Sequence, residues 1–253
     1  MRTVLALATI LVMTAILGPI VIVARLFGAR EGEGSIAQRA MHLWARSLNW
    51  AAGVEVRVHG AEHIERNRGA IYVANHVSWY DIFAIAAILP RYSFIAKSEL
   101  RRIPLFGIAA EAAGIVFIDR DNRKSAFESY KVAAKEVQRG RSVVVCPEGT
   151  RGRDYHLRPF KKGPFVLAIA AEAPVIPTIV HGTIDVMRKG SFRIRSGVVD
   201  VHFLDPIETT GFSYDQRAEL MKRVWRRMAD TMRDLYAVGT DEFPIAQEHE
   251  RTA

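Results

Sequence analysis

The chain has 253 residues, of which 49% are apolar, so it is long enough for one large domain with a packed core. Its single cysteine, Cys146, excludes an intramolecular disulfide and a cysteine-rich metal site. Its net charge of +8 suits nucleic acid, an anionic lipid or an acidic carrier. The sequence has no helix-turn-helix, zinc-finger or aromatic RNA-binding pattern, so we expect no nucleic-acid partner.

The first segment is apolar over Thr3–Ala24, with Arg2 and Arg25 on either side. A helix of that length spans about 33 Å, close to the hydrocarbon core of a bilayer. The run is long and no convincing cleavage site follows it, which favours a membrane anchor over a cleaved signal peptide. Gly18-Pro19 within the run predicts a kinked spanning helix or a re-entrant hairpin. Arg25 and Arg30 favour placing the body of the protein on the cytoplasmic side of the inner membrane.

A second helix is predicted over Ser35–Trp50, where Ile36, Ala40, Trp44 and Leu48 recur every four residues. A basic amphipathic helix with tryptophans is able to lie in the membrane interface or to pack on a core, and the sequence leaves both open. We therefore expect residues 1–52 to form membrane-anchoring helices.

Strands and helices alternate through the rest of the chain. Apolar or alternating runs predict strands over Val54–His59, Ala70–Ala74, Tyr92–Ala96, Gly114–Ile118, Ser142–Cys146, Val175–Val180 and Val198–Phe203. Helical patterns lie over Asp81–Leu89, Lys124–Arg139, Pro164–Glu172 and Tyr214–Tyr236. Residues 53–240 are thus predicted to form an α/β domain, and residues 241–253 a polar tail. The expected fold is a mixed, largely parallel sheet flanked by helices, preceded by an N-terminal membrane helix or helical hairpin.

The segment NHVSWYD, residues 75–81, directly follows a predicted strand, at the end where α/β sheets present their sites. Histidine is the side chain best suited to proton transfer near neutral pH, so His76 is able to take a proton from an alcohol. If His76 lies in the turn before a helix and Asp81 in its first turn, the carboxylate reaches the imidazole and fixes its tautomer. The alternative is structural, because Ser78 and Asp81 also match a helix capping box.

The segment PEGTR, residues 147–151, follows another predicted strand. Gly149 allows the backbone to approach a ligand, Thr150 offers a hydroxyl, and Arg151 offers a planar fork that binds phosphate at two points. We interpret the segment as a phosphate site, with an ordinary basic surface loop as the alternative. The proline in the segment VIPT, Pro177, predicts an edge strand or a bulge.

In this order, the segments NHVSWYD, GIVFIDR, PEGTR and VIPT resemble the motifs of the glycerolipid acyltransferase family, over roughly Val54 to Gly182. The resemblance implies that His76 is the catalytic base and Asp81 its partner. It also implies that the acceptor's phosphate is bound by a set of residues from the second and third motifs and the nearby segment AKSEL: Lys97, Arg120, Glu148, Gly149 and Arg151. The fourth motif, around Pro177, is associated with the acyl-donor side.

The resemblance further implies transfer of a fatty acyl group from acyl-CoA or acyl-acyl carrier protein to the sn-2 hydroxyl of 1-acyl-sn-glycerol-3-phosphate (lysophosphatidic acid), forming phosphatidic acid. We expect no metal and no bound cofactor, because the sequence has no histidine–carboxylate cluster with zinc spacing. Three alternatives stay open. They are a covalent mechanism through Cys146, another acceptor such as a lyso-ornithine lipid, and a non-enzymatic membrane-binding module with a basic face.

Overall fold

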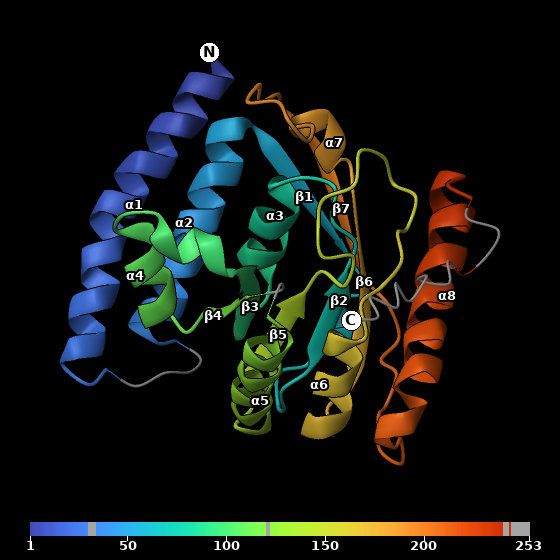
Figure 1. Cartoon of the computed structure of the whole chain (residues 1–253). Helices are drawn as coiled ribbons and strands as arrows, with labels where there is room; N and C mark the ends of the chain where they lie inside the picture. Colours follow the sequence, from blue (N-terminus) through green and yellow to red (C-terminus); the bar gives the residue numbers. More distant parts are fainter. Residues whose placement is uncertain (30–33, 120–121, 240–242, 244–253) are drawn as a thin grey trace, which may run out of the picture.

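The structure is a computed structural model that describes residues 1–29, 34–119, 122–239 and 243 (Figure 1). Its strands are β1 (Val54–His59), β2 (Ile71–Ala74), β3 (Tyr92–Lys97), β4 (Val116–Ile118), β5 (Ser142–Val145), β6 (Val175–His181) and β7 (Gly197–Phe203). Its helices are α1 (Arg2–Leu26), α2 (Ile36–Ala52), α3 (Tyr80–Ile88), α4 (Phe106–Ala112), α5 (Arg123–Gln138), α6 (Gly163–Ala171), α7 (Thr183–Val186) and α8 (Arg217–Tyr236). Every strand and helix predicted from the sequence overlaps one of these elements, whereas α4 and α7 were not predicted.

The strands of the described residues form one sheet in the order β1-β7-β6-β2-β5-β3-β4. All neighbouring strands are parallel except β6 and β7. The predicted mixed, largely parallel sheet is therefore confirmed. Because β2 and β6 are parallel neighbours, the segments that follow them leave the sheet at the same edge.

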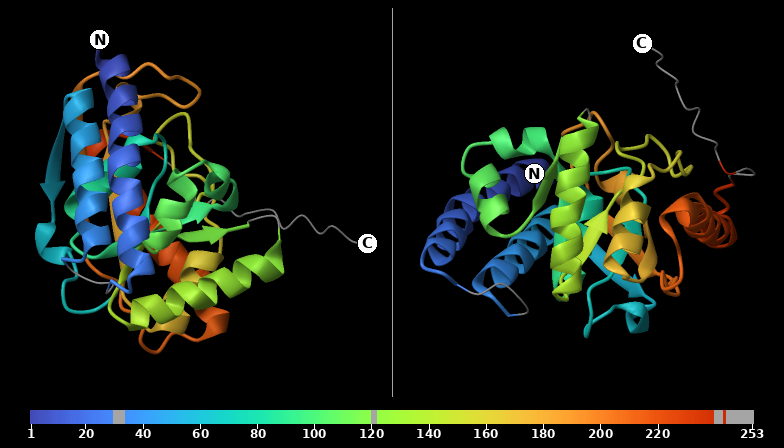
Figure 2. Two further views of the ribbon diagram at one scale, coloured as in Figure 1. Left: turned by 90° about the vertical axis from the view of Figure 1, so that its left-hand side faces the viewer. Right: turned by 60° about the horizontal axis from the view of Figure 1, so that its bottom comes forward.

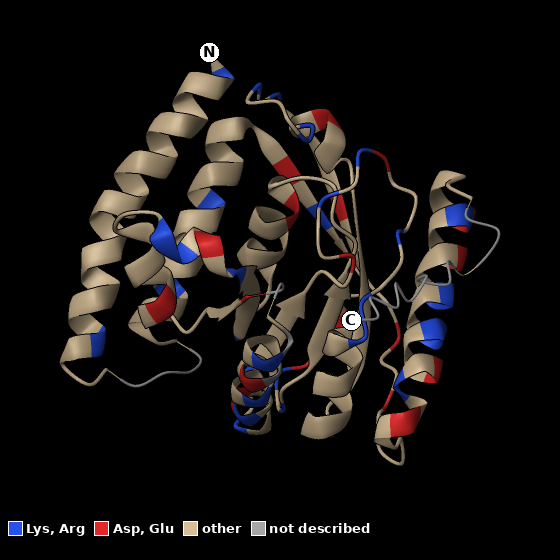
Figure 3. Ribbon diagram, viewed as in Figure 1, with Lys and Arg blue, Asp and Glu red and all other residues tan. Residues whose placement is uncertain are grey.

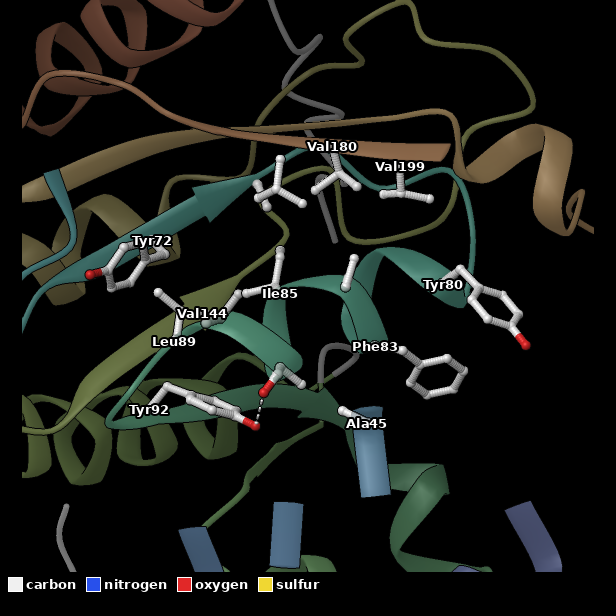
Figure 4. Packing of buried hydrophobic residues seen from close by; sticks show 14 of the residues in the cluster. Ala45, Tyr72, Tyr80, Phe83, Ile85, Leu89, Tyr92, Val144, Val180 and Val199 are labelled. Carbon is white, nitrogen blue, oxygen red and sulfur yellow. Dashed lines mark hydrogen bonds between the residues drawn. The ribbon is translucent and has the colours of Figure 1, made fainter. Parts of the chain in front are cut away.

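Helices cover both faces of the sheet (Figure 2). In β2, Tyr72 and Ala74 pack on the side of α2 and α3, while Ile71 and Val73 pack on the side of α5, α6 and α8. Helix α3 is apolar on nearly all sides, and it lies between the sheet and α2 (Figure 4). The body is thus a three-layer α/β/α arrangement.

Helix α1 is continuous through Pro19, so the re-entrant hairpin is wrong and the single apolar N-terminal helix is confirmed. Near its start, Thr3 exchanges two hydrogen bonds with the backbone of Ile194 (2.9 and 3.3 Å). Near its end, Val21 packs against Ala113, just beyond α4. Helix α1 therefore lies against the body along its length, with most of its large apolar side chains exposed.

Helix α2 is capped by Ser35, whose side chain accepts the N–H of Gln38 (3.2 Å). It packs between α1 and α3 and buries Ala45 and Leu48, which confirms that one face packs on the core. The opposite face keeps Trp50 exposed. The division of the chain at residues 52 and 240 stays a prediction, and all of the predicted tail except residue 243 lies outside the described residues.

Strand β6 has β2 on one side and β7 on the other, so the prediction that Pro177 marks an edge strand is wrong. The register of the antiparallel partner changes at this proline: Thr178 faces Phe203, but Val175 bridges Ile207. One extra residue on the partner side makes this stretch bulge-like. The Pro177 carbonyl accepts a backbone N–H from the same stretch, so the proline nitrogen, which has no hydrogen, faces the irregular part of the ladder.

Candidate active site

His76 lies in the loop after β2, and Asp81 lies in the first turn of α3. The imidazole Nδ1 and the carboxylate Oδ2 are 2.8 Å apart. The same oxygen accepts the backbone N–H groups of Val77 (2.7 Å) and Ser78 (2.8 Å). The Asp81 carboxylate therefore has both of the roles considered from the sequence. It orients the imidazole, and it accepts backbone N–H groups at the start of the helix.

The Asp81 side chain is fully buried, whereas that of His76 keeps 17% of its surface exposed. An ionised carboxylate only accepts hydrogen bonds, so the proton of the neutral imidazole lies on Nδ1. Nε2 then keeps its lone pair. The arrangement is suited to accepting a proton from a hydroxyl group at Nε2.

Thr183, at the start of α7, donates its hydroxyl to the other carboxylate oxygen of Asp81 (2.5 Å). Both oxygens of the buried carboxylate are thus hydrogen-bonded. Our sequence reasoning missed Thr183, because it is 102 positions from Asp81 and belongs to none of the four motifs. Only the parallel pairing of β2 with β6 brings the two residues together.

The backbone around His76 is held from two sides. The Asn75 amide group donates to the carbonyl of Val180 (3.0 Å) and accepts its N–H (2.8 Å), which ties the end of β2 to β6. The His76 N–H donates to Glu148 Oε1 (2.9 Å), and the His76 carbonyl accepts the N–H of Gly152 (2.7 Å). The loop that contains PEGTR therefore fixes the position of His76.

Glu148 is 6% exposed. Burial raises the pKa of its carboxyl group to about 8, although the hydrogen bond from the His76 N–H acts in the opposite direction. Burial thus favours the protonated form of this carboxyl group in the folded protein. The described hydrogen bond of Glu148 is with the backbone N–H of His76. Its role in phosphate binding stays a prediction.

The guanidinium of Arg151 lies over the Trp79 ring, with Cζ 4.9 Å from the ring centroid. Partial burial lowers the pKa of Arg151, and the Asp81 carboxylate opposes this effect. Among the described residues, no carboxylate forms an ion pair with this guanidinium. The backbone carbonyl of Arg151 accepts hydrogen bonds from Lys189 Nζ (2.6 Å) and from Arg158 Nη1 (3.2 Å). A stacked cation thus stands beside the His76–Asp81 pair.

The remaining predicted binding residues differ in position. Gly149 has φ +75°, and a Cβ there would lie 2.8 Å from the Lys161 side chain, so the turn requires glycine. Thr150 is exposed in the same turn. Lys97 ends β3, two strands from β2, and forms an ion pair with Glu99.

Arg120, which the resemblance assigns to the acceptor's phosphate, lies outside the described residues. Its predicted role stays a prediction. The structure thus brings Glu148, Gly149, Thr150 and Arg151 to the loop beside His76, while Lys97 lies further along the sheet.

One histidine–carboxylate group in the described part of the chain comes close enough to hold a metal ion: His59, Asp200 and His202. Spacing along the sequence did not indicate it, because the β1–β7 register brings it together. The two imidazole rings are stacked, with centroids 4.2 Å apart and planes inclined by 11°. Their in-plane lone pairs therefore do not converge on one point. His59 Nε2 instead hydrogen-bonds with Asp200 (2.8 Å), and we assign no metal to the group.

Residues 55–181, about half of the chain, match the model of the acyltransferase family. The chain belongs to the acyltransferase family. It is 35% identical to a 1-acyl-sn-glycerol-3-phosphate acyltransferase from Limnanthes douglasii over 185 residues, which are 72% of this chain and 65% of that protein. It is 32% identical to 1-acyl-sn-glycerol-3-phosphate acyltransferase alpha from Homo sapiens over 213 residues, which are 83% of this chain and 75% of that protein.

A crystal structure of the 1-acyl-sn-glycerophosphate (LPA) acyltransferase PlsC from Thermotoga maritima has a similar fold, with a TM-score of 0.72 and 27% sequence identity. The likeness covers 95% of this acyltransferase-family chain and 100% of that chain. It must therefore include most of the N-terminal helices. The match to the Limnanthes douglasii relative, in contrast, spans just under two thirds of that protein's length.

Proposed function

We propose that the chain is a 1-acyl-sn-glycerol-3-phosphate acyltransferase. It moves a fatty acyl group from acyl-CoA or acyl-acyl carrier protein to the sn-2 hydroxyl of lysophosphatidic acid, which forms phosphatidic acid. The observation that carries the proposal is the His76–Asp81 hydrogen bond (2.8 Å) at the end of β2. Membership of the acyltransferase family and relatives named for this reaction support it.

In the proposed reaction, His76 acts as the general base. Nε2 takes the proton of the sn-2 hydroxyl as the oxygen attacks the carbonyl carbon of the thioester. The carbon–sulfur bond then breaks, and the leaving thiolate takes the proton back from the imidazolium. Asp81 stabilises that imidazolium and keeps the ring oriented, with Thr183 holding the second carboxylate oxygen. The products are an ester and a free thiol, so atoms and charge balance.

Arg151 is proposed to bind the phosphate of the acceptor. Its guanidinium is stacked over Trp79, close enough to the reacting pair for Asp81 to affect its pKa. A guanidinium donates two parallel hydrogen bonds to a phosphate group. Gly149 and Thr150 precede it in the same turn and are proposed to line the phosphate, with Lys97 and Arg120 as further contacts.

Helix α1 is proposed to attach the enzyme to the cytoplasmic face of the inner membrane. Among the described helices it is the one long and apolar enough to cross a bilayer. Both ends of α1 contact the body. If α1 spanned the bilayer, the neighbouring α2 would have to enter the hydrocarbon region with it, together with the charged residues Arg39 and Arg46. We therefore propose that α1 lies lengthwise in the membrane interface, with its outward apolar face among the lipids.

The test is to supply the purified protein with palmitoyl-CoA or palmitoyl-acyl carrier protein and one of three acceptors. These are lysophosphatidic acid, lysophosphatidylcholine and a lyso-ornithine lipid, and the products are identified by mass spectrometry. We expect phosphatidic acid from the first acceptor and little product from the other two. Equal turnover of the lyso-ornithine lipid would contradict the assigned acceptor. Thiol release without any acylated lipid would contradict the transfer itself.

A further inference from the structure

The loop between α7 and β7, residues 187–196, connects the candidate active site with the start of α1. At its first residue, the carbonyl of Met187 accepts the hydroxyl of Ser78, which belongs to the NHVSWYD segment (2.7 Å). Near its end, the backbone of Ile194 exchanges two hydrogen bonds with the Thr3 side chain of α1. A surface that contacts both α1 and this α7–β7 loop therefore lies beside the candidate active site.

The α7–β7 loop is closed by hydrogen bonds of its own backbone. The Arg195 N–H donates to the carbonyl of Val186 (3.0 Å), and the Ser191 N–H donates to that of Arg188 (3.0 Å). The Ser191 hydroxyl in turn accepts the N–H of Arg193 (3.0 Å). This folding of the loop brings its three arginines around a small surface pocket of about 140 Å³.

The pocket is lined by more cations than anions. Arg188, Arg193 and Arg195 line it together with one carboxylate, that of Asp185. All three arginines are exposed, and among the described residues no carboxylate forms an ion pair with them. Figure 3 shows blue segments on this loop and at the adjoining start of α1, where Arg2 lies. The guanidinium groups are therefore accessible to an anion from outside the protein.

The same loop exposes an aromatic side chain. Phe192, which directly precedes one of the arginines, is 78% exposed. The outward apolar face of α1 begins next to the loop, because exposed Val4 follows Thr3, the residue that holds Ile194. Cations mixed with an aromatic residue beside an apolar helix are typical of a segment that lies in a membrane interface.

We propose that the α7–β7 loop is a membrane-binding surface that selects anionic lipid headgroups. Its three arginines bind the headgroup phosphates, and Phe192 enters the lipid layer beside α1. The inference rests on the proposed attachment of the enzyme to a membrane and adds the class of lipid that the attachment selects. An acidic carrier protein would also be attracted by these charges, but the exposed ring and the adjoining apolar face of α1 favour a membrane.

The test is flotation of the full-length protein with liposomes. One set contains phosphatidylcholine alone, and the other contains equal parts of phosphatidylcholine and phosphatidylglycerol. We expect wild type to bind the anionic liposomes at least about tenfold more tightly, because each arginine near an anionic surface favours binding. The combined variant Arg188→Gln, Arg193→Gln and Arg195→Gln should lose most of this preference while still binding neutral liposomes through α1.

The matched control removes the same charge from the other side of the sheet, where α5 and α8 pack. It combines three substitutions at exposed positions: Lys135→Gln, Lys222→Gln and Arg226→Gln. This control should keep the preference of wild type, and thermal melts confirm that both combined variants are folded. An equal loss of the preference in the two variants would overturn the proposal, because net charge and not the loop would then govern binding.

Phe192→Ala tests the aromatic contact separately. It should weaken binding to both kinds of liposome about threefold or more, because the burial of a phenyl ring among lipids is lost. Its melting temperature should equal that of wild type, since the ring packs little on the body. Leu235→Ala, at an exposed position of α8, is the control and should bind as wild type does. Unchanged binding of Phe192→Ala would overturn the insertion of the ring.

A titration of the same variants with palmitoyl-acyl carrier protein in detergent distinguishes the other partner. If the combined arginine variant keeps the preference for anionic liposomes but loses the carrier protein, the loop binds the carrier and the proposal is overturned. Wild type that binds liposomes without regard to headgroup charge also overturns it, while the attachment through α1 stands. None of these measurements follows acyl transfer, so their failure is distinct from failure of the proposed function.

Discussion

At the scale of single residues, the Asp81 carboxylate receives one hydrogen bond from an imidazole, two from backbone N–H groups and one from a hydroxyl. The hydroxyl of Thr183 alone comes from outside the His76–Asp81 segment. Its loss would leave one oxygen of a buried carboxylate without a partner and free the carboxylate to move. We therefore propose Thr183 as a positioning residue, which acts through Asp81 on the proposed base, His76.

We predict that Thr183→Val lowers kcat about tenfold, the effect of losing roughly one hydrogen bond to a charged group. The Michaelis constants for both substrates should change little, because the Thr183 hydroxyl bonds to Asp81 and not to Arg151, the proposed phosphate ligand. Thr183→Ser keeps the hydroxyl and should recover most of the rate. Saturation kinetics check this, and equal losses in the valine and serine variants would contradict the role.

Arg151→Lys keeps the positive charge but loses the two-point geometry of the guanidinium. We predict that the Michaelis constant for lysophosphatidic acid rises about tenfold, while that for the acyl donor stays nearly unchanged. Arg153→Lys, at an exposed position of the same loop, is the matched control. If the donor constant rises instead, Arg151 binds the phosphates of the donor.

Glu148 predicts a pH dependence of stability. Its pKa of about 8 in the folded protein exceeds the ordinary value of 4.5, so the folded state holds more protons between these limits. The free energy of unfolding therefore falls as pH rises through this window. Glu148→Gln keeps an oxygen that accepts the His76 N–H but cannot ionise. The free energy of unfolding of Glu148→Gln minus that of wild type should therefore increase with pH, by at most about 1.4 kcal/mol per pH unit. Denaturant unfolding at several pH values between 5 and 8 measures this, and a difference independent of pH would contradict the raised pKa.

At the scale of elements, buried strands were predictable because they are short valine- and isoleucine-rich runs between turn residues. Helix α4 was not predictable in this way, since it has only seven residues and begins after Leu105, which has φ +62°. The sequence left an edge strand and a bulge both open at Pro177, because it does not reveal which strands flank β6. His76 and Asp81 were predictable as a pair because they lie five positions apart in one motif. Thr183 was not predictable, because only the order of the strands brings it near Asp81.

Helix α1 combines an inner face that packs on the body with an outer apolar face. Leu11 and Ile16 are 70% and 53% exposed, so Leu11→Glu and Ile16→Glu should leave the melting temperature nearly unchanged. Each loses about 1.5–3 kcal/mol of apolar burial if that face lies among lipids, which weakens liposome binding at least tenfold. Leu235→Glu, at an exposed apolar position of α8, is the control and should have no effect. Liposome flotation that is equal for all variants would contradict the proposed membrane face.

Deletion of residues 1–27 is expected to behave differently from these substitutions. It uncovers the side of α2 on which Trp44 donates to Thr14 (3.0 Å), and it removes Ala6 from the core. We predict a lower melting temperature together with loss of membrane binding. A truncated protein with an unchanged melting temperature would show that α1 adds little to the stability of the body.

At the scale of the whole molecule, the sheet places the His76–Asp81 pair at the carboxyl end of β2, while α1 and α2 cover one side of the body (Figure 2). An enzyme that acylates a lysolipid needs both features, since its acceptor stays anchored in the membrane by its acyl chain. We propose that the His76 imidazole activates the hydroxyl of that acceptor.

This role of His76 is tested by the initial rate at which wild type and His76→Ala form phosphatidic acid from lysophosphatidic acid and acyl-CoA. The control is His156→Ala, which removes an exposed histidine paired with Asp154 in the neighbouring loop. We predict that His76→Ala lowers the rate at least about 100-fold with an unchanged melting temperature, because general-base catalysis contributes a factor of that size. His156→Ala should keep the wild-type rate. A His76→Ala protein that retains more than about a tenth of the wild-type rate would contradict the account.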